Sequence, residues 1–242
     1  MARQLADNPR IVLGLPTGQT PIPLYRELIA LYRAGRVDCS HATTFNLDEF
    51  VGLGSHDSTS YQRFMCRHLF DHLNFSPRRT HFLNGMAPDA VAECARFEKA
   101  IDRAGGIDLM VLGLGRNGHI GFNEPDRALV ARTHRTRLSL STRRANAFLF
   151  GDQLRAVPRE ALSMGMATIL SARRIVLFVT GRTKARLVER VLDGRITPRV
   201  PGSFLQLHRD VEVWLDAAAS LPASSSRRRG STSSPIASRT KS

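Results

Sequence analysis

The sequence predicts a three-layer α/β/α domain built on a mainly parallel, Rossmann-like sheet. Strand and helix signals alternate along most of the 242-residue chain, a pattern typical of parallel strands joined by crossover helices. Two short apolar runs, at residues 10–15 and 107–112, end in glycine-rich polar loops, PTGQTP and GLGRNGH. In open α/β sheets, loops at the carboxyl ends of strands hold the ligand. We expect one such domain over residues 1–219.

The individual elements follow from periodicity. Continuous apolar or β-branched runs predict strands, at residues 10–15, 43–47, 80–83, 107–112, 174–180 and 211–215. Apolar side chains three and four residues apart predict helices, at residues 24–32, 60–73, 88–104, 142–150 and 181–192. Gly105 and Gly106 end the third of these helices.

The charge of the chain is strongly positive, and it favours an anionic ligand. The formal net charge is +14, which suits a phosphorylated metabolite or a nucleic acid. The sequence has no basic–aromatic interleaving, zinc finger or basic zipper, so nucleic-acid binding is the weaker hypothesis. Part of the charge lies in residues 220–242, which are rich in serine and arginine and nearly free of large apolar side chains. This composition predicts a disordered basic tail.

Composition also limits the location of the protein. No stretch is long and apolar enough to span a bilayer, and the first residues, MARQLADNPR, contain no apolar signal region. The three cysteines, Cys39, Cys66 and Cys94, are widely spaced and form neither a zinc pattern nor a disulfide framework. We therefore expect a soluble cytoplasmic protein with buried, inert thiols and no bound metal.

The first glycine-containing loop is a candidate phosphate site. A strand, a short polar loop and a helix offer backbone N–H groups and hydroxyls to an anion; here the loop residues are Thr17, Gly18, Gln19 and Thr20. The loop lacks the Gly-Lys-Ser/Thr of a P-loop, and a plain strand-to-helix turn explains it equally well. Arg143 and Lys184 are candidate phosphate cations, although surface charge is the simpler reading of most arginines near residue 143.

The second loop is a candidate proton-transfer site. Asn117, His119 and Glu124 follow an apolar strand within eight positions, and an imidazole beside a carboxylate can move protons near neutral pH. Asp48 and Glu49 end another strand and place carboxylates at the same edge of the sheet. Solvated loop residues, or a helix cap at Asp48, are the alternatives.

Several ordered motifs carry a resemblance to a known family. They are LGLPTGQTP, TFNLDEFVGL, SYQRFMCRHLFDH, FLNG, GLGRNGHIGFNEP, TRRAN, the segment 181–184 and SFLQLH. Over about residues 8–216, the chain resembles the glucosamine-6-phosphate deaminases, whose wider family includes the 6-phosphogluconolactonases. The resemblance implies conversion of glucosamine 6-phosphate to fructose 6-phosphate and ammonia, without a metal or organic cofactor.

The resemblance also implies residue roles. Asp48 would move a proton between C2 and C1 of the sugar. His119 and Glu124 would open the pyranose ring, with Asn117 orienting the imidazole. The phosphate would lie on residues 17–20, with Arg143 and Lys184 closing on it. Other implications stay open: members of the family range from monomers to hexamers, so a homo-oligomer is one expectation.

Two departures and three alternatives accompany this resemblance. The family often has Asp where this chain has Asn117, and it usually has a strand and a helix before the first phosphate loop, where this chain has only about a dozen residues before Leu13. The sheet is therefore expected to lack the family's first strand. A galactosamine-6-phosphate deaminase, a 6-phosphogluconolactonase and a non-enzymatic phosphosugar-binding regulator remain alternatives, and Glu124 favours a deaminase over a lactonase.

Overall fold

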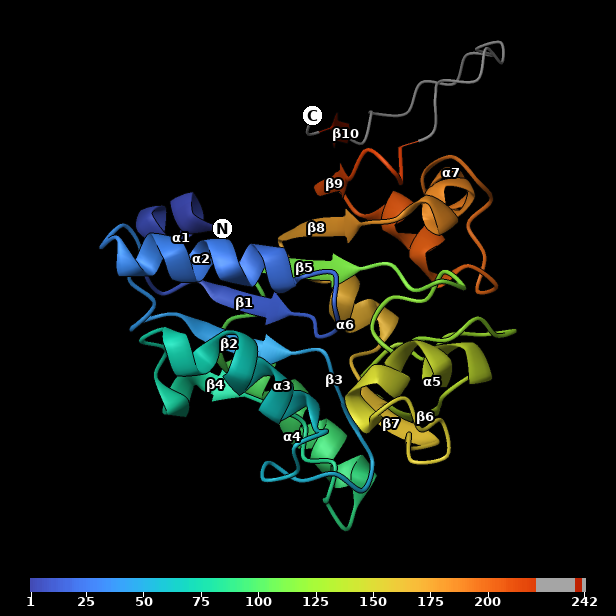
Figure 1. The fold of residues 1–242 in the computed structure, drawn as a ribbon, viewed down its shortest axis with the longest axis horizontal. Helices are drawn as coiled ribbons and strands as arrows, with labels where there is room; N and C mark the ends of the chain where they lie inside the picture. The colour runs from blue at the N-terminus through green and yellow to red at the C-terminus, as the bar shows by residue number, and fades with distance from the viewer. Residues whose placement is uncertain (221–237, 241–242) are drawn as a thin grey trace.

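A seven-stranded parallel sheet lies at the centre of the domain (Figure 1). The structure is a computed structural model that describes residues 1–220 and 238–240. In spatial order the strands are β10 (Ser238–Thr240), β9 (Val211–Leu215), β8 (Arg174–Val179), β5 (Leu109–Gly113), β1 (Val12–Leu15), β2 (Thr43–Asn46) and β4 (Thr80–His81). All neighbouring pairs are parallel. The carboxyl ends of β8, β5 and β1 are therefore adjacent at one edge of the sheet.

Helices cover both faces of this sheet, which confirms the three-layer prediction. They are α1 (Ala2–Asp7), α2 (Ile22–Arg33), α3 (Tyr61–His68), α4 (Ala90–Arg103), α5 (Leu140–Asn146), α6 (Met166–Leu170) and α7 (Ala185–Leu192). Leu109 and Val111 of β5 belong to the core formed with α1, α2 and α3. Met110 and Leu112 belong to the core formed with α4, α6 and α7. The strand period of two thus buries side chains on both faces, and this is why the run is apolar throughout.

A second, three-stranded sheet was not predicted from the sequence. Its strands are antiparallel, in the order β3 (Asp48–Phe50), β7 (Glu160–Ser163) and β6 (His134–Arg137). The strands are short, and β6 is polar and only half-buried, so no apolar run reveals them. Only Leu47 separates β2 from β3, and Asp48 consequently lies where the chain passes from one sheet to the other.

Coverage of the main sheet is thinner over β8 and β9. Ile175 and Leu177 are fully buried on one face, whereas Val176, Phe178 and Trp214 on the other face are half-buried. These three side chains line a groove of about 760 Å³ beside α2. The expectation that the sheet lacks the family's first strand stays a prediction.

The basic tail expected over residues 220–242 lies almost entirely outside the described residues. Within it, Ser238–Thr240 forms β10 and pairs with β9, where the sequence predicts disorder. An edge strand such as β9 offers unpaired backbone N–H and C=O groups, which a short segment of almost any sequence can pair with. None of the helices in the described part of the chain is long and apolar enough to cross a membrane.

Candidate active site

A cavity of about 570 Å³ opens at the carboxyl ends of β1, β5 and β8. This volume is ordinary for a small-molecule site. Most of the residues proposed from the sequence line it: Thr17, Gly18, Gln19, Thr20, Asp48, His119 and Lys184. Asn117 lies one hydrogen bond behind the lining, through His119, and Glu124 lies one hydrogen bond further, through Asn117. The fold therefore gathers into one cavity groups that lie far apart in the sequence.

Asp48 is a buried carboxyl group in the cavity wall. Its exposed fraction is 6%, and it accepts a hydrogen bond of 3.4 Å from the Thr17 hydroxyl. Burial and, to a smaller extent, the negative charge of Glu49 raise the pKa of Asp48 to about 8, against the opposing effect of the Thr17 hydrogen bond. A carboxyl group with a pKa near neutrality can both accept and return a proton.

Glu49 has a different role from its neighbour. Its carboxylate accepts hydrogen bonds from the backbone N–H groups of Phe50, Tyr61 and Gln62, each at 2.9 Å. Two of these donors open α3, so Glu49 satisfies N–H groups that the helix leaves without a partner. The carboxylate pair expected from the sequence thus divides into one group in the cavity and one that caps a helix.

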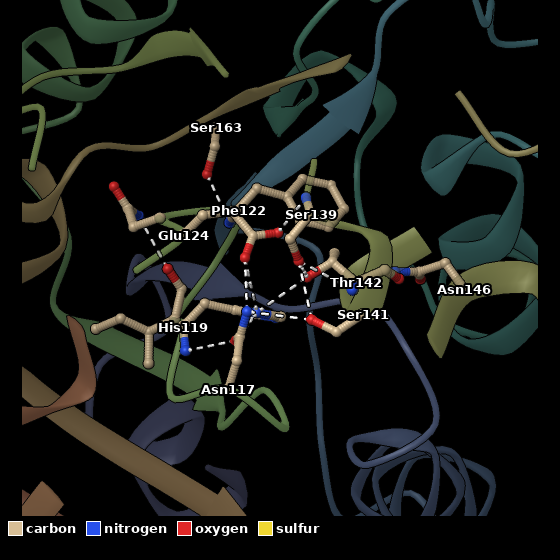
Figure 2. A network of polar contacts seen from close by, with 11 residues as sticks. Asn117, His119, Phe122, Glu124, Ser139, Ser141, Thr142, Asn146 and Ser163 are labelled. Carbon is tan, nitrogen blue, oxygen red and sulfur yellow. Dashed lines mark hydrogen bonds and ion pairs between the residues drawn. The ribbon is translucent and has the colours of Figure 1, made fainter. Parts of the chain in front are cut away.

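His119, Asn117 and Glu124 form a connected network (Figure 2). The Asn117 amide nitrogen donates to Glu124 Oε2 at 2.7 Å, while the other carboxylate oxygen accepts from the Ser139 N–H at 3.1 Å. The Asn117 amide oxygen therefore faces the imidazole, 2.7 Å from Nδ1. Glu124 itself is 3.8 Å from the same nitrogen. Glu124 therefore fixes the orientation of the Asn117 amide, and the amide oxygen in turn fixes the orientation of the imidazole ring.

This network fixes the tautomer of His119. An amide oxygen can only accept, so Nδ1 carries the ring proton and Nε2 is the free base. Burial lowers the pKa of His119, Lys184 lowers it further, and Glu124 opposes both effects. The ring is consequently neutral near pH 7 and ready to take up a proton.

Gly115 allows the imidazole to occupy its position. A Cβ on Gly115 would lie 2.3 Å from both Cε1 and Nε2 of His119, a separation that real carbon atoms do not tolerate. The Gly115 N–H also bonds the His119 carbonyl at 2.9 Å. The glycine is therefore required for the close approach of backbone and ring.

One part of the cavity lining, the cationic end, carries two cations and several hydroxyl groups. Lys184 and Arg116 both line it, together with the loop between β1 and α2. Burial lowers the pKa of Lys184, the positive charge of Arg116 lowers it further, and Asp216 opposes this. The loop turns at Gly18, whose φ is +88°, and Tyr25 supports it by donating a 2.5 Å hydrogen bond to the Pro16 carbonyl. Together these groups make a site for a doubly charged anion.

Arg143 does not enter the cavity. Its guanidinium donates to the carbonyl oxygens of Leu154 and Val157, at 2.8 and 2.9 Å, and it is absent from the lining residues. These contacts hold the segment that follows α5. A phosphate contact from Arg143, as the sequence predicts, would require the guanidinium to leave both carbonyls.

Sequence reasoning did not propose Arg116, Tyr61 or Asn146 as site residues, although all three line the cavity. Arg116 is the cation inside the second glycine-rich loop, and its position directly before Asn117 could have indicated it. Tyr61 donates a 2.7 Å hydrogen bond to Asn146, and both face the cavity beside Asp48. Both also lie in motifs that carry the resemblance, SYQRF and TRRAN, but no single-residue chemistry marks them.

Comparison with known proteins identifies the family of this chain. Residues 1–214 match the family described as glucosamine-6-phosphate isomerases/6-phosphogluconolactonase. The chain belongs to this family. It is 48% identical over 219 residues to a glucosamine-6-phosphate deaminase of Halothermothrix orenii, covering 90% of each protein. It is also 48% identical to one of Clostridioides difficile, covering 90% of this chain and 88% of that one.

Solved structures separate the two branches of the family. A monomeric glucosamine-6-phosphate deaminase superposes with a TM-score of 0.87 at 44% identity, and the match covers 90% of each chain. A 6-phosphogluconolactonase of Thermotoga maritima gives a TM-score of 0.67 at 19% identity, over 89% of this chain and 88% of that one. The second likeness concerns the fold alone, so the deaminase branch is the nearer one.

Metal ligands are not assembled in the described part of the chain. No group of three or more His, Cys, Asp or Glu side chains among residues 1–220 and 238–240 is placed to hold a metal ion.

Proposed function

We propose that this protein converts glucosamine 6-phosphate and water to fructose 6-phosphate and ammonia. The observation that carries the proposal is that Asp48 and the imidazole of the His119–Asn117–Glu124 network face one cavity whose lining also holds two cations, Lys184 and Arg116. An aldose-to-ketose conversion needs two separate proton-transfer groups beside one sugar, and this cavity supplies both. The relatives' names and their 48% identity support the same reaction.

Ring opening uses the imidazole. The free Nε2 of His119 takes the proton of the C1 hydroxyl and becomes an imidazolium. The imidazolium gives a proton to O5 as the C1–O5 bond breaks. Glu124 stabilises the imidazolium that forms in between, because its carboxylate lies 3.8 Å from Nδ1. Asn117 supplies an oriented acceptor but no charge, so Glu124 is the anion that balances the ring.

Proton transfer between carbons uses Asp48. In the open-chain sugar its carboxylate removes the proton from C2 as O1 takes up a proton, giving an enolamine with a C1–C2 double bond. The carboxylate then returns its proton to C1 and the nitrogen gives up one proton, which balances the one gained by O1, so that the double bond becomes a C2 imine. Water then adds to C2, and the C2–N bond breaks to release ammonia. The substrate's ammonium group beside Asp48 favours the ionised carboxylate and so counteracts the raised pKa of about 8.

The phosphate provides binding energy at a distance from the reacting carbons. Thr17, Gly18, Gln19 and Thr20 and the ammonium of Lys184 form the cationic end of the cavity. Energy gained there positions C1 and C2 against the two proton-transfer groups. All the proposed residues belong to one chain, so a monomer is sufficient for the chemistry.

The test is a coupled assay of fructose 6-phosphate and ammonia with the full chain. Glucosamine 6-phosphate, galactosamine 6-phosphate and 6-phosphogluconolactone are compared as substrates. We expect turnover of the first, with equimolar ammonia and ketose. Preference for galactosamine 6-phosphate would assign the enzyme to the other epimer of the substrate. Preference for the lactone would contradict the deaminase proposal. A folded protein that binds phosphosugars without turnover would favour the regulator hypothesis.

A further inference from the structure

Three adjacent strands deliver their loops to the cationic end of the cavity. β5 lies between β1 and β8 in the sheet, so the loop after β5 runs between the two loops assigned to the phosphate. A Cβ on Gly113, the last residue of β5, would lie 4.0 Å from the Thr20 side chain. Arg116 follows three residues later and lines the same cavity. The loop that carries Arg116 therefore leaves the sheet beside the first phosphate loop.

Arg116 and Lys184 are like charges that face a common space. The charge of Arg116 is close enough to lower the pKa of Lys184. Within residues 1–220, no acidic side chain forms an ion pair with Arg116. Asp216 is the acid whose charge raises the pKa of Lys184. Its carboxylate already accepts hydrogen bonds from the backbone N–H groups of Gly181 and Ala219. A dianion placed between the two cations would remove their mutual repulsion.

We propose that Arg116 is a phosphate-binding residue of this enzyme, which closes on the phosphate from the loop after β5, opposite Lys184. The inference rests on the proposed function for the identity of the ligand, a sugar phosphate. It adds Arg116 to the cations that the resemblance implies; in this structure the guanidinium of one of them, Arg143, is held by two backbone carbonyls. Arg116 has no such bonds to break.

The position of Arg116 also connects binding to chemistry. It directly precedes Asn117, so a phosphate held by Arg116 restrains the loop that orients His119. The phosphate would also neutralise Lys184, whose charge lowers the pKa of His119 against the opposing effect of Glu124. The imidazole therefore becomes a stronger base once the phosphate is seated. Part of the phosphate's binding energy is then expressed in kcat.

The experiment compares Arg116→Gln, Arg116→Lys and Arg182→Gln in the full chain. Arg182 is the matched control, because it is exposed and near Lys184 in sequence but does not line the cavity. Calorimetry with inorganic phosphate measures binding without turnover. We expect Arg116→Gln to weaken phosphate binding by about tenfold, since a charge-assisted bidentate contact is lost. Arg116→Lys should recover part of the affinity, and Arg182→Gln should stay within about twofold of wild type, as for exposed charges.

Kinetics with glucosamine 6-phosphate separate the possible failures. We expect Arg116→Gln to raise KM and to lower kcat. If Arg116→Gln binds phosphate as tightly as wild type, the inference is wrong. Turnover of glucosamine 6-phosphate by the wild-type protein would still support the proposed function in that case. If Arg116→Gln loses phosphate affinity but the wild-type protein does not turn over glucosamine 6-phosphate, Arg116 is an anion-binding residue and the proposed reaction is wrong. NMR titration of the His119 ring should show that phosphate raises its pKa in wild type, and that Arg116→Gln needs about tenfold more phosphate for the same change.

Discussion

The two ends of the cavity differ in how completely their polar groups are satisfied. At the proton-transfer end, His119, Asn117 and Glu124 are bonded to one another, with distances of 2.7 Å along the chain of contacts. At the cationic end, Lys184 and Arg116 act on each other as like charges. The first end is organised by contacts within the protein, whereas the second holds two cations that no ion pair neutralises in the described residues. Under the proposed function, the protein fixes the geometry of proton transfer and the substrate's phosphate supplies the balancing charge.

Replacing Asp48 should have the largest effect on kcat, because Asp48 is the group proposed to move the proton between C2 and C1. We expect Asp48→Asn to lower kcat by about 10³-fold or more, since general-base catalysis contributes up to about 10⁴-fold. The change is nearly isosteric, so KM should shift little. The coupled assay measures both constants, and a variant that retains a tenth of the wild-type kcat would disprove the assignment.

Breaking the network behind His119 should cost less. Glu124→Gln keeps the size of the side chain but removes the charge that stabilises the imidazolium, and we expect kcat to fall by about 10²-fold. Glu98→Gln is the control, because Glu98 is also a hydrogen-bonded carboxylate of low exposure but bonds Thr133 and Thr168 rather than the network behind His119. Equal losses in the two variants would indicate a general folding defect rather than a role for Glu124.

The buried carboxyl group of Asp48 should lower stability as pH rises. Its pKa is raised to about 8, so between about pH 4 and 8 the folded protein keeps a proton that the unfolded chain has released. Unfolding free energy therefore falls with increasing pH in this window. We expect Asp48→Asn to gain stability over wild type, by a few kcal/mol at pH 8 and by little at pH 4.5. Denaturant unfolding at both pH values tests this, and a gain independent of pH would contradict it.

Crowding the imidazole should produce a smaller loss that sharpens the same comparison. In Gly115→Ala the new Cβ would lie 2.3 Å from the His119 ring, so the ring must move. We expect kcat to fall by about tenfold or more, because displacement of a catalytic group by about 1 Å has effects of this size. Gly54→Ala, whose Cβ would only contact Met86 at 3.4 Å, is the control for kcat and Tm. Wild-type kcat in Gly115→Ala would show that the ring position is not critical.

The smallest expected change concerns Arg143 at the margin of the cationic end. Its guanidinium bonds two carbonyls after α5, so Arg143→Gln should lower Tm by a few degrees, as for the loss of buried hydrogen bonds. KM for glucosamine 6-phosphate should change by less than about threefold. A tenfold rise in KM with unchanged Tm would instead show that Arg143 turns to the phosphate, as the resemblance implies.

Sequence reasoning recovered the central sheet because its strands are continuous apolar runs. β9 has the predicted bounds, and β1, β2, β5 and β8 lie within a residue or two of theirs. It did not recover the antiparallel sheet of β3, β6 and β7, whose strands are three or four residues long and partly polar. Strands this short gain their stability from partners distant in sequence, and local patterns carry little information about such pairing.

The site divides in the same way. The glycine-rich loops and their polar residues could be predicted, because a loop at the carboxyl end of a parallel strand has a known place in the fold. The separate roles of Asp48 and Glu49 could not be predicted. They depend on which carboxylate meets the first N–H groups of α3, a contact between elements that local sequence does not encode.

The sequence by itself determined the fold class, the family and the loops that bear the chemistry, because these follow from periodicity and from motifs that are contiguous in the chain. Only the tertiary structure decided which cation faces the cavity. Arg116 and Arg143 are equally charged in the sequence, but packing gives one of them two backbone carbonyls and leaves the other in the cavity lining. The partners available to a long charged side chain are set by the surrounding fold, and they determine whether its charge is available to a ligand.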